Sequence, residues 1–243
     1  MAIRSGAKIS STIGSLLSLW LCVGAAWAEV VKAEDYRAFW LWAGVKPQAV
    51  LTTAEEIYLL AGEVRGEERP HIISQRSAIP KIKDAKVWIV YRAQTLHWDE
   101  RVYENVMKQL SDWQQAGNNI VGMQIDFDAG TRNLDRYAEF LATVRTHLPR
   151  GCKLSVTGLL DWSANGDPVK LASLADVVDE VVLQIYQGRR VIPGYRNYLA
   201  KLDYLPLPFR MGLLQGGEWE APATFEDNPN FRGYVVFLLN GVP

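Results

Sequence analysis

The chain has 243 residues, of which 49% are hydrophobic and 22% are charged, and its formal net charge is −1. This composition excludes a disordered chain, a collagen-like fibre and a small disulfide-stabilised toxin, because it supplies enough apolar side chains for a core. The near-neutral charge gives no electrostatic reason to expect nucleic acid or an acidic lipid surface as a partner.

The first 28 residues are organised like a secretory signal peptide. Arg4 and Lys8 precede an apolar run over residues 13–23, and Ala26-Trp27-Ala28 supplies small residues for cleavage. We expect cleavage after Ala28, export to the periplasm or the medium, and a single mature domain over residues 29–243. The signal removes two basic residues and no acidic one, so the mature net charge is −3.

Two alternatives to a cleaved signal are an uncleaved anchor and a lipoprotein. A spanning anchor needs an apolar run of roughly 20 residues, which is longer than this one. A lipoprotein would carry its lipid on Cys22, but Trp20 and Leu21 occupy the positions where small residues normally precede such a cysteine. Cleavage would leave Cys152 as the only cysteine, so no disulfide framework is expected.

Short apolar runs rich in β-branched and aromatic residues recur along the mature chain and predict strands. We count eight: Arg37–Trp42, Ile57–Ala61, Lys86–Arg92, Gly122–Asp128, Lys153–Leu160, Glu180–Tyr186, Phe209–Leu214 and Gly233–Leu239. Helical periodicity predicts helices over Glu100–Gln115 and Leu134–Leu148. Asp167 as N-cap and Pro168 at the first position predict a short helix through Ala175, and another is expected over 194–202.

Strands that alternate with helices pair in parallel, and eight of them predict an α/β fold of the (β/α)8 TIM-barrel type. The mature chain is shorter than the roughly 250 residues typical of that fold. Residues 63–85 and 216–232 lack helical period, so some outer helices should be missing or irregular. The rival fold is an open doubly wound sheet, which needs a glycine-rich turn after the first strand, where only Ala43-Gly44-Val45 occurs.

Polar side chains occupy alternate positions of two predicted strands. Gln124, Asp126 and Asp128 share one face of the fourth strand, and Gln184 and Tyr186 share one face of the sixth. In a barrel that face points into the lumen, where unpaired polar groups are costly unless they bind each other or a ligand. The alternation therefore predicts a functional site in the lumen.

Active sites of such barrels lie at the carboxyl ends of the strands. Besides the lumen residues, the strand ends offer further substrate-binding candidates: Trp40, Trp42, Arg92, Asp161, Trp162, Gln187, Gln215, Glu218 and Trp219. Carboxylates and amides suit sugar hydroxyls, and tryptophan rings suit the apolar faces of sugars, so we expect a carbohydrate ligand. Trp88 and Trp113 are expected in the core.

Each of these residues also has a purely structural interpretation. Asp128 precedes Ala129-Gly130 and can cap the following helix, and Asp126 can be a structural hydrogen-bonding group. Asp161 can be a loop residue, and each tryptophan can be packing. The three histidines are widely spaced, and no HExxH, CxxC or GxSxG motif occurs, so neither a metal nor a cofactor is expected.

The segments QIDFDAGT, FWLW, LQIYQG, LLQGGEW and GYVVFLLN together resemble an exported bacterial family known as domain of unknown function 3142. That family is grouped with the barrel glycoside hydrolases, so the resemblance implies a barrel and a carbohydrate substrate. A more distant likeness is to chitinase-like glycoside hydrolases, whose D-x-D-x-E motif falls on Gln124, Asp126 and Asp128. Their strand-six motif falls on Gln184, Tyr186 and Gln187, and only Asp126 and Tyr186 match in type.

Two functions follow from these residues. The first is a monomeric glycoside hydrolase acting on a bacterial polysaccharide or cell-wall glycan, with Asp128 as general acid and Asp126 as its electrostatic partner. Repulsion between the two carboxylates would raise the pKa of one of them, and Asp161 or Glu218 can instead supply the second carboxylate. The alternative is a carbohydrate-binding barrel without catalysis, and a third possibility is a scaffold with an unused lumen.

Overall fold

The computed structural model describes residues 28–225 and 227–242. The predicted signal peptide and Cys22 lie outside the described residues, except for Ala28. None of the helices in the described residues combines the length and the apolar character of a membrane-spanning segment.

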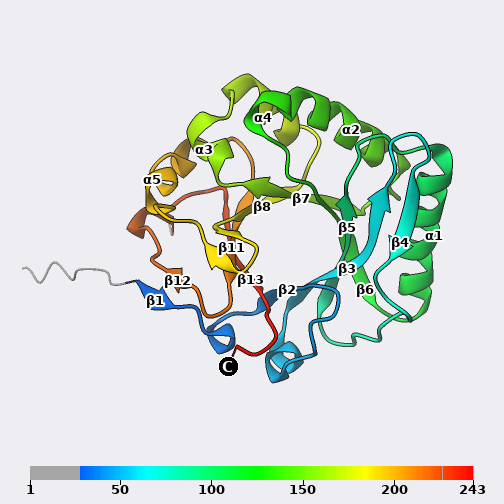
Figure 1. Ribbon diagram of the computed structural model, residues 1–243, viewed down its shortest axis with the longest axis horizontal. Helices are drawn as coiled ribbons and strands as arrows, with labels where there is room; N and C mark the ends of the chain where they lie inside the picture. Colours follow the sequence, from blue (N-terminus) through cyan, green and yellow to red (C-terminus); the bar gives the residue numbers. More distant parts are fainter. Residues whose placement is uncertain (1–27, 226, 243) are drawn as a thin grey trace, which may run out of the picture.

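Eight parallel strands within the described residues close into a barrel (Figure 1). They are β2 (Ala38–Leu41), β3 (Glu56–Arg65), β5 (Lys86–Ala93), β6 (Asn119–Asp126), β7 (Lys153–Leu159), β8 (Glu180–Gln184), β11 (Phe209–Leu214) and β13 (Phe231–Phe237). Each pairs in parallel with the next one along the chain, and β13 pairs with β2 to complete the ring. The predicted TIM-like barrel is confirmed, and this closure excludes the open doubly wound sheet.

The helices cover only part of the outside of the barrel. They are α1 (Glu100–Gln115), α2 (Leu134–His147), α3 (Asp161–Asn165), α4 (Pro168–Ala175) and α5 (Arg196–Leu199). Asp167 caps α4 as predicted, because its side chain accepts hydrogen bonds from the backbone N–H groups of Val169 and Lys170. The helix expected over 194–202 is shorter, and a 3-10 turn, η4 (Leu202–Tyr204), follows it.

Short irregular elements replace helices at three places in the ring. η2 (Ala49–Thr53) joins β2 to β3, and β4 (His71–Ser74) lies antiparallel against β3. Between β11 and β13 run β12 (Glu218–Trp219), paired with β1 (Glu29–Val30), and η5 (Ala223–Phe225). The remaining short elements are η1 (Ala33–Asp35), η3 (Thr131–Asn133), β9 (Tyr186–Gln187) and β10 (Arg190–Val191). The predicted irregular outer ring is therefore confirmed.

The two faces of the strands carry different side chains. On β6, Met123 and Ile125 are fully buried against the helical layer, where α1 contributes Val106, Leu110 and Trp113. Trp88 and Trp113 are both buried, as predicted for the core. The opposite strand faces fill the lumen.

A buried polar cluster fills the lower lumen, at the amino ends of the strands. Its centre is Glu180, which accepts hydrogen bonds from Tyr58 Oη at 2.6 Å, Ser155 Oγ at 3.1 Å and Arg210 Nε at 3.1 Å. The pKa of Tyr58 lies well above its usual value, because the hydroxyl is buried beside the Glu180 carboxylate. The tyrosine therefore stays neutral and acts as a donor.

Three further residues complete this cluster. Glu56 accepts a hydrogen bond from Arg210 Nη2 at 3.1 Å and one from Trp88 Nε1 at 3.0 Å, and Gln124 Nε2 donates to Ser155 Oγ at 3.0 Å. We call the seven residues the lower lumen network: Glu56, Tyr58, Trp88, Gln124, Ser155, Glu180 and Arg210. They link six strands and occupy the bottom of the barrel.

Candidate active site

A cavity of about 870 Å³ opens at the carboxyl ends of the barrel strands. Nine of the residues predicted from the sequence line it: Trp40, Trp42, Arg92, Asp126, Asp128, Asp161, Gln184, Tyr186 and Gln187. They come from both halves of the chain, because the carboxyl ends of parallel strands meet at one end of a barrel. We call this space the mouth cavity.

Asp126 is the last residue of β6 and lies at the base of the mouth cavity, with 5% of its surface exposed. Its Oδ1 accepts a hydrogen bond from Thr157 Oγ1 at 2.9 Å, and its Oδ2 lies 3.9 Å from Arg92 Nη1. Burial raises the pKa of Asp126 to about 6, against the lowering effects of Arg92 and Thr157. Repulsion from Asp128 and Glu63 adds to this rise as a smaller cause, whereas the sequence suggested repulsion alone.

Asp128 lies two residues beyond the end of β6, and its side chain is 65% exposed. Its Oδ2 is 3.9 Å from Arg92 Nη2, so one guanidinium faces both aspartates. The intervening Phe127 turns outward, since its ring packs 5.3 Å from that of Tyr137 on α2. The side chain of Asp128 caps neither η3 nor α2, which excludes the capping interpretation.

Arg92 is held by charge and by ring stacking. Its guanidinium carbon lies 5.2 Å from the centre of the Trp42 ring, which is a cation–π contact. At 3.9 Å the two carboxylates are beyond direct hydrogen-bonding distance. The N–H groups of Arg92 therefore face a cavity in which a ligand can accept their hydrogen bonds.

Aromatic rings form one wall of the mouth cavity around Phe237, at the end of β13. Its ring centre lies 4.7 Å from Trp40, 5.2 Å from Tyr186 and 5.7 Å from Trp42. The indole N–H of Trp40 is buried and has no hydrogen-bond partner among residues 28–225 and 227–242. The wall therefore combines apolar faces with one donor, the combination that sugar rings require.

Sequence reasoning missed several residues of this site. Thr157 is one of them, although it follows the inward alternation set by Ser155 on the same strand, and that signal was available. Phe237 was assigned to a strand without a role, and Tyr198 and Arg189 carried no recognisable signal. Arg189 reaches the cavity because it lies in the turn between β9 and β10, and local sequence does not show where that hairpin folds.

Five predicted substrate-binding residues do not line the mouth cavity. Gln124 belongs to the lower lumen network, and Gln215 is buried in hydrogen bonds with Gln48 and the backbone of Leu239. Trp162 is fully buried and donates its indole N–H to the carbonyl oxygen of Ala129 at 2.7 Å.

The remaining two, Glu218 and Trp219, lie on β12. Glu218 is exposed and paired with β1, and Trp219 stacks on Tyr195 with ring centres 5.5 Å apart. Each of the five side chains therefore has contacts outside the mouth cavity, and proximity to a strand end in sequence does not by itself place a side chain in the mouth.

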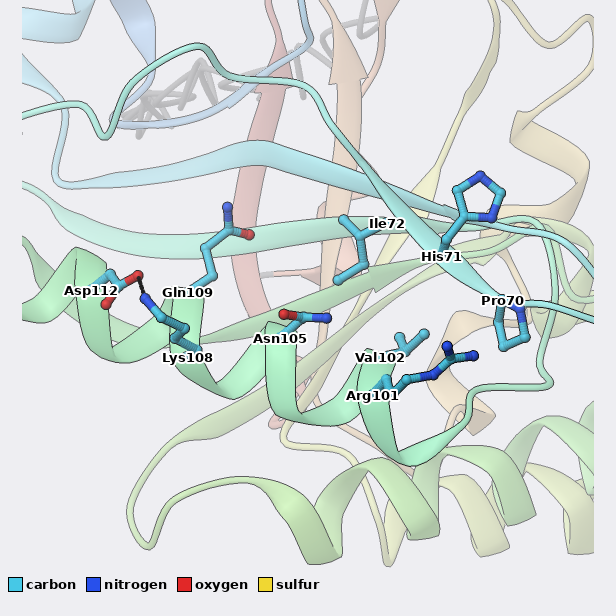
Figure 2. A pocket seen from close by; sticks show the side chains of 9 residues that line it. All are labelled: Pro70, His71, Ile72, Arg101, Val102, Asn105, Lys108, Gln109 and Asp112. Atoms are coloured by element: carbon cyan, nitrogen blue, oxygen red, sulfur yellow. Dashed lines mark hydrogen bonds and ion pairs between the residues drawn. The ribbon is translucent and has the colours of Figure 1, made fainter.

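A second pocket, of about 480 Å³, lies outside the barrel between β4 and α1 (Figure 2). Its walls are His71 and Ile72 from β4 and a row of polar side chains from α1. Asp112 is the one carboxylate among the described residues that line it, and it is paired with Lys108 at 2.6 Å. This pocket therefore lacks the pair of facing carboxylates that distinguishes the mouth cavity. The described residues contain no group of three or more His, Cys, Asp or Glu side chains placed to hold a metal.

The fold defines a TIM-barrel protein, and the candidate site lies at the carboxyl ends of its strands. The family model described as "Domain of unknown function (DUF3142)" matches residues 90–194, a stretch that includes Asp126, Asp128 and Tyr186. The resemblance predicted from the sequence is confirmed over this stretch. No curated protein matches the chain.

Solved structures with a similar fold include the following two. The spore cortex-lytic enzyme SleL of Bacillus cereus is 13% identical, with a TM-score of 0.53, over 85% of this chain and 70% of that one. The xylanase and alpha-amylase inhibitor protein XAIP-II of Scadoxus multiflorus is 11% identical, with a TM-score of 0.51, over 83% of this chain and 92% of that one. At such identities the likeness shows the fold alone.

The raised pKa of Asp126 predicts a pH-dependent loss of stability. A carboxyl group whose pKa is about 6 when folded and near 3.8 when unfolded stabilises the fold fully below pH 3.8, and that contribution is lost as pH rises through 6. The asparagine side chain in Asp126→Asn cannot ionise, so the variant does not lose this contribution. The free energy of unfolding of the variant minus that of the wild type should therefore increase by about 2 kcal/mol between pH 4 and pH 7.

Urea unfolding at several pH values in this range measures the effect. Asp84→Asn removes an exposed carboxylate and serves as the control, and its curve should follow that of the wild type. A constant difference between Asp126→Asn and the wild type across the range would contradict the raised pKa.

Proposed function

We propose that this protein is a glycoside hydrolase that cleaves a bacterial polysaccharide or cell-wall glycan in the mouth cavity. The observation that carries the proposal is Asp126, a buried carboxyl group with a pKa near 6 at the base of a large cavity, with the exposed Asp128 facing the same arginine. The predicted signal peptide supports a substrate outside the cytoplasm, in the periplasm or the medium.

Glycoside cleavage requires a group that is protonated at working pH and a second carboxylate. We assign the general acid to Asp126, in place of Asp128 as the sequence suggested, since burial is what keeps a carboxyl group protonated near neutral pH. Arg92 lies beside the Oδ2 atom of Asp126 and stabilises the carboxylate that remains after the proton has been donated.

Asp128 is our candidate for the second carboxylate, as base or nucleophile. It is solvent-exposed, which suits a group that activates water. Asp161 also lines the cavity, but its side chain is hydrogen-bonded to Asn165 within α3. Glu218 lies on β12, away from the cavity.

A panel of bacterial and model glycans tests the proposal. The mature protein should release reducing ends from at least one glycan, with activity that falls as pH rises above 6. Complete lack of turnover across a broad panel, by a protein shown to be folded, would refute the hydrolase.

A substitution in the aromatic wall tests the site itself. Trp42→Ala removes both a ring face and the support of Arg92, so we expect glycan binding to weaken by about tenfold, as loss of a cation–π contact and apolar area predicts. Tyr36→Ala is the matched control, since Tyr36 is a half-buried aromatic residue near the opposite end of the barrel. Equal binding by both variants, measured by calorimetry, would remove the mouth cavity as the ligand site.

A second candidate function is carbohydrate binding without catalysis. One of the two similar structures is named as an inhibitor protein, so this type of barrel occurs in proteins not named as enzymes. A binding protein would show ligand-dependent thermal stabilisation with a glycan of the panel and no product.

A further inference from the structure

We infer that Thr157 is a positioning residue that fixes the Asp126 carboxyl group and selects Oδ2 as the oxygen that carries the proton towards the substrate. This inference rests on the proposed function, because it assigns how the general acid is presented. Thr157 was not among the residues expected from the sequence, and it does not line the mouth cavity.

The barrel places Thr157 beside Asp126. β6 and β7 are paired in parallel, with Ile125 opposite Val156, so the next residues of the two strands are neighbours that face the lumen. Thr157 is 3% exposed, and its side chain is enclosed within the barrel. Thr157 can therefore influence the site only through the residues that it contacts, Asp126 and Phe127.

Two hydrogen bonds determine the orientation of the Thr157 hydroxyl. Its oxygen accepts the backbone N–H of Phe127 at 3.2 Å, and its O–H donates to Asp126 Oδ1 at 2.9 Å. The hydroxyl is thus held between the residue that follows Asp126 and the carboxyl group itself. This arrangement fixes the plane of the carboxyl group.

The donated hydrogen bond also determines where the proton of Asp126 resides. If Oδ1 carried the proton, the O–H of Thr157 would need another acceptor, and its two hydrogen bonds within the described residues supply none. Oδ1 therefore stays an acceptor, and the proton belongs on Oδ2, the oxygen nearer Arg92. A general acid must present its proton in one direction, and Thr157 supplies that direction.

Several other charged or titratable groups lie near Asp126, and a pH test of Thr157 must take them into account. Arg92 on β5 favours the ionised form of Asp126. Asp128, which follows β6, and Glu63, which lies on β3, disfavour the ionised form. Tyr137 on α2 and Tyr186 after β8 are buried near Asp126, and their pKa values are raised well above 10, so both stay neutral. None of these groups changes when Thr157 is replaced.

The test compares Thr157→Val with Thr157→Ser. Valine keeps the shape but removes the hydroxyl, so the pKa of Asp126 should rise by about one unit, as expected for loss of a hydrogen bond to a charged group. The descending limb of the pH–rate profile should shift to higher pH by the same amount. We also expect kcat to fall by about tenfold with little change in KM. Serine retains the hydroxyl and should restore both values.

Thr95→Val is the matched control. Thr95 is also 3% exposed, donates to a carboxylate, Glu67, at 3.0 Å, and accepts a backbone N–H, that of His97, at 3.0 Å. This variant removes the same pair of hydrogen bonds away from Asp126. It should leave the pKa of Asp126 and the pH–rate profile unchanged.

Two readouts separate this inference from the proposed function. The ¹³C resonance of the Asp126 carboxyl group, assigned with Asp126→Asn, reports its titration without any substrate. An unchanged Asp126 titration in Thr157→Val would overturn the positioning role even if the wild type is an active hydrolase. If no glycan is cleaved, the proposed function fails, and the carboxyl titration still tests whether Thr157 holds Asp126.

Discussion

Replacing Asp126 by asparagine is expected to lower kcat for glycan hydrolysis by about 10² to 10⁴, the usual contribution of a general acid. The amide has nearly the same shape but cannot donate a proton to the glycosidic oxygen. Binding should change little, because the aromatic wall and Arg92 remain in place. Steady-state kinetics on the glycan found in the panel, with calorimetry for binding, measures both effects.

The choice of leaving group distinguishes the two aspartates. In an aryl glycoside made with a very acidic phenol, the phenolate leaves without being protonated. Asp126→Asn should therefore retain much of its activity on that substrate. Asp128→Asn should lose activity on both kinds of substrate, since the second carboxylate acts on the sugar or on water.

Added azide can take the place of a missing base or nucleophile, so it should restore activity on the aryl glycoside to Asp128→Asn. Activity on the aryl glycoside that is retained by Asp128→Asn without azide and lost in Asp126→Asn would return the general acid to Asp128. Full activity of Asp126→Asn on natural glycan would remove Asp126 from the mechanism.

Replacing Arg210 by methionine is expected to lower the free energy of unfolding by about 3 to 5 kcal/mol, the cost of leaving buried partners without their charge. Arg210 bridges Glu180 and Glu56 with hydrogen bonds of 3.1 Å, and both carboxylates are largely buried. Methionine fills the volume but leaves two negative charges facing each other in the lower lumen. Urea unfolding followed by circular dichroism measures the loss.

Arg196→Met is the matched control for this substitution. Arg196 pairs with Glu220 at 2.7 Å, but its side chain is 55% exposed, and exposed ion pairs contribute little to stability because water screens them. Similar losses for the two variants would show that the lower lumen network does not stabilise the barrel beyond an ordinary surface ion pair.

Much of the fold was predictable because local patterns report local structure. The period of Val102, Val106 and Leu110 predicted α1 with its observed ends, and Asp167 before Pro168 predicted the start of α4. Strand ends were less predictable. β3 extends to Arg65, beyond its predicted end at Ala61, because the next strand, β4, pairs with its carboxyl end, and the residues of β3 by themselves do not show that pairing.

The site was only partly predictable. Alternation correctly placed Asp126, Gln184 and Tyr186 on the inward face, but it also placed Gln124 there, two residues lower on the same strand. A period of two shows which face a residue occupies and not its height along the barrel. Height decides whether a polar group meets the network below or the open mouth above.

An eight-stranded barrel with an incomplete helical ring and a polar lumen could be predicted from local patterns, because apolar periodicity and the Gly, Pro and polar residues that bound each run are local properties of the chain. Which polar groups share the mouth, and which carboxyl group holds a proton near neutral pH, became clear only from the folded barrel. The pKa of Asp126 depends on burial and on Arg92, Thr157 and Glu63, which come from three other strands. Residues this far apart in sequence become neighbours only when the barrel closes.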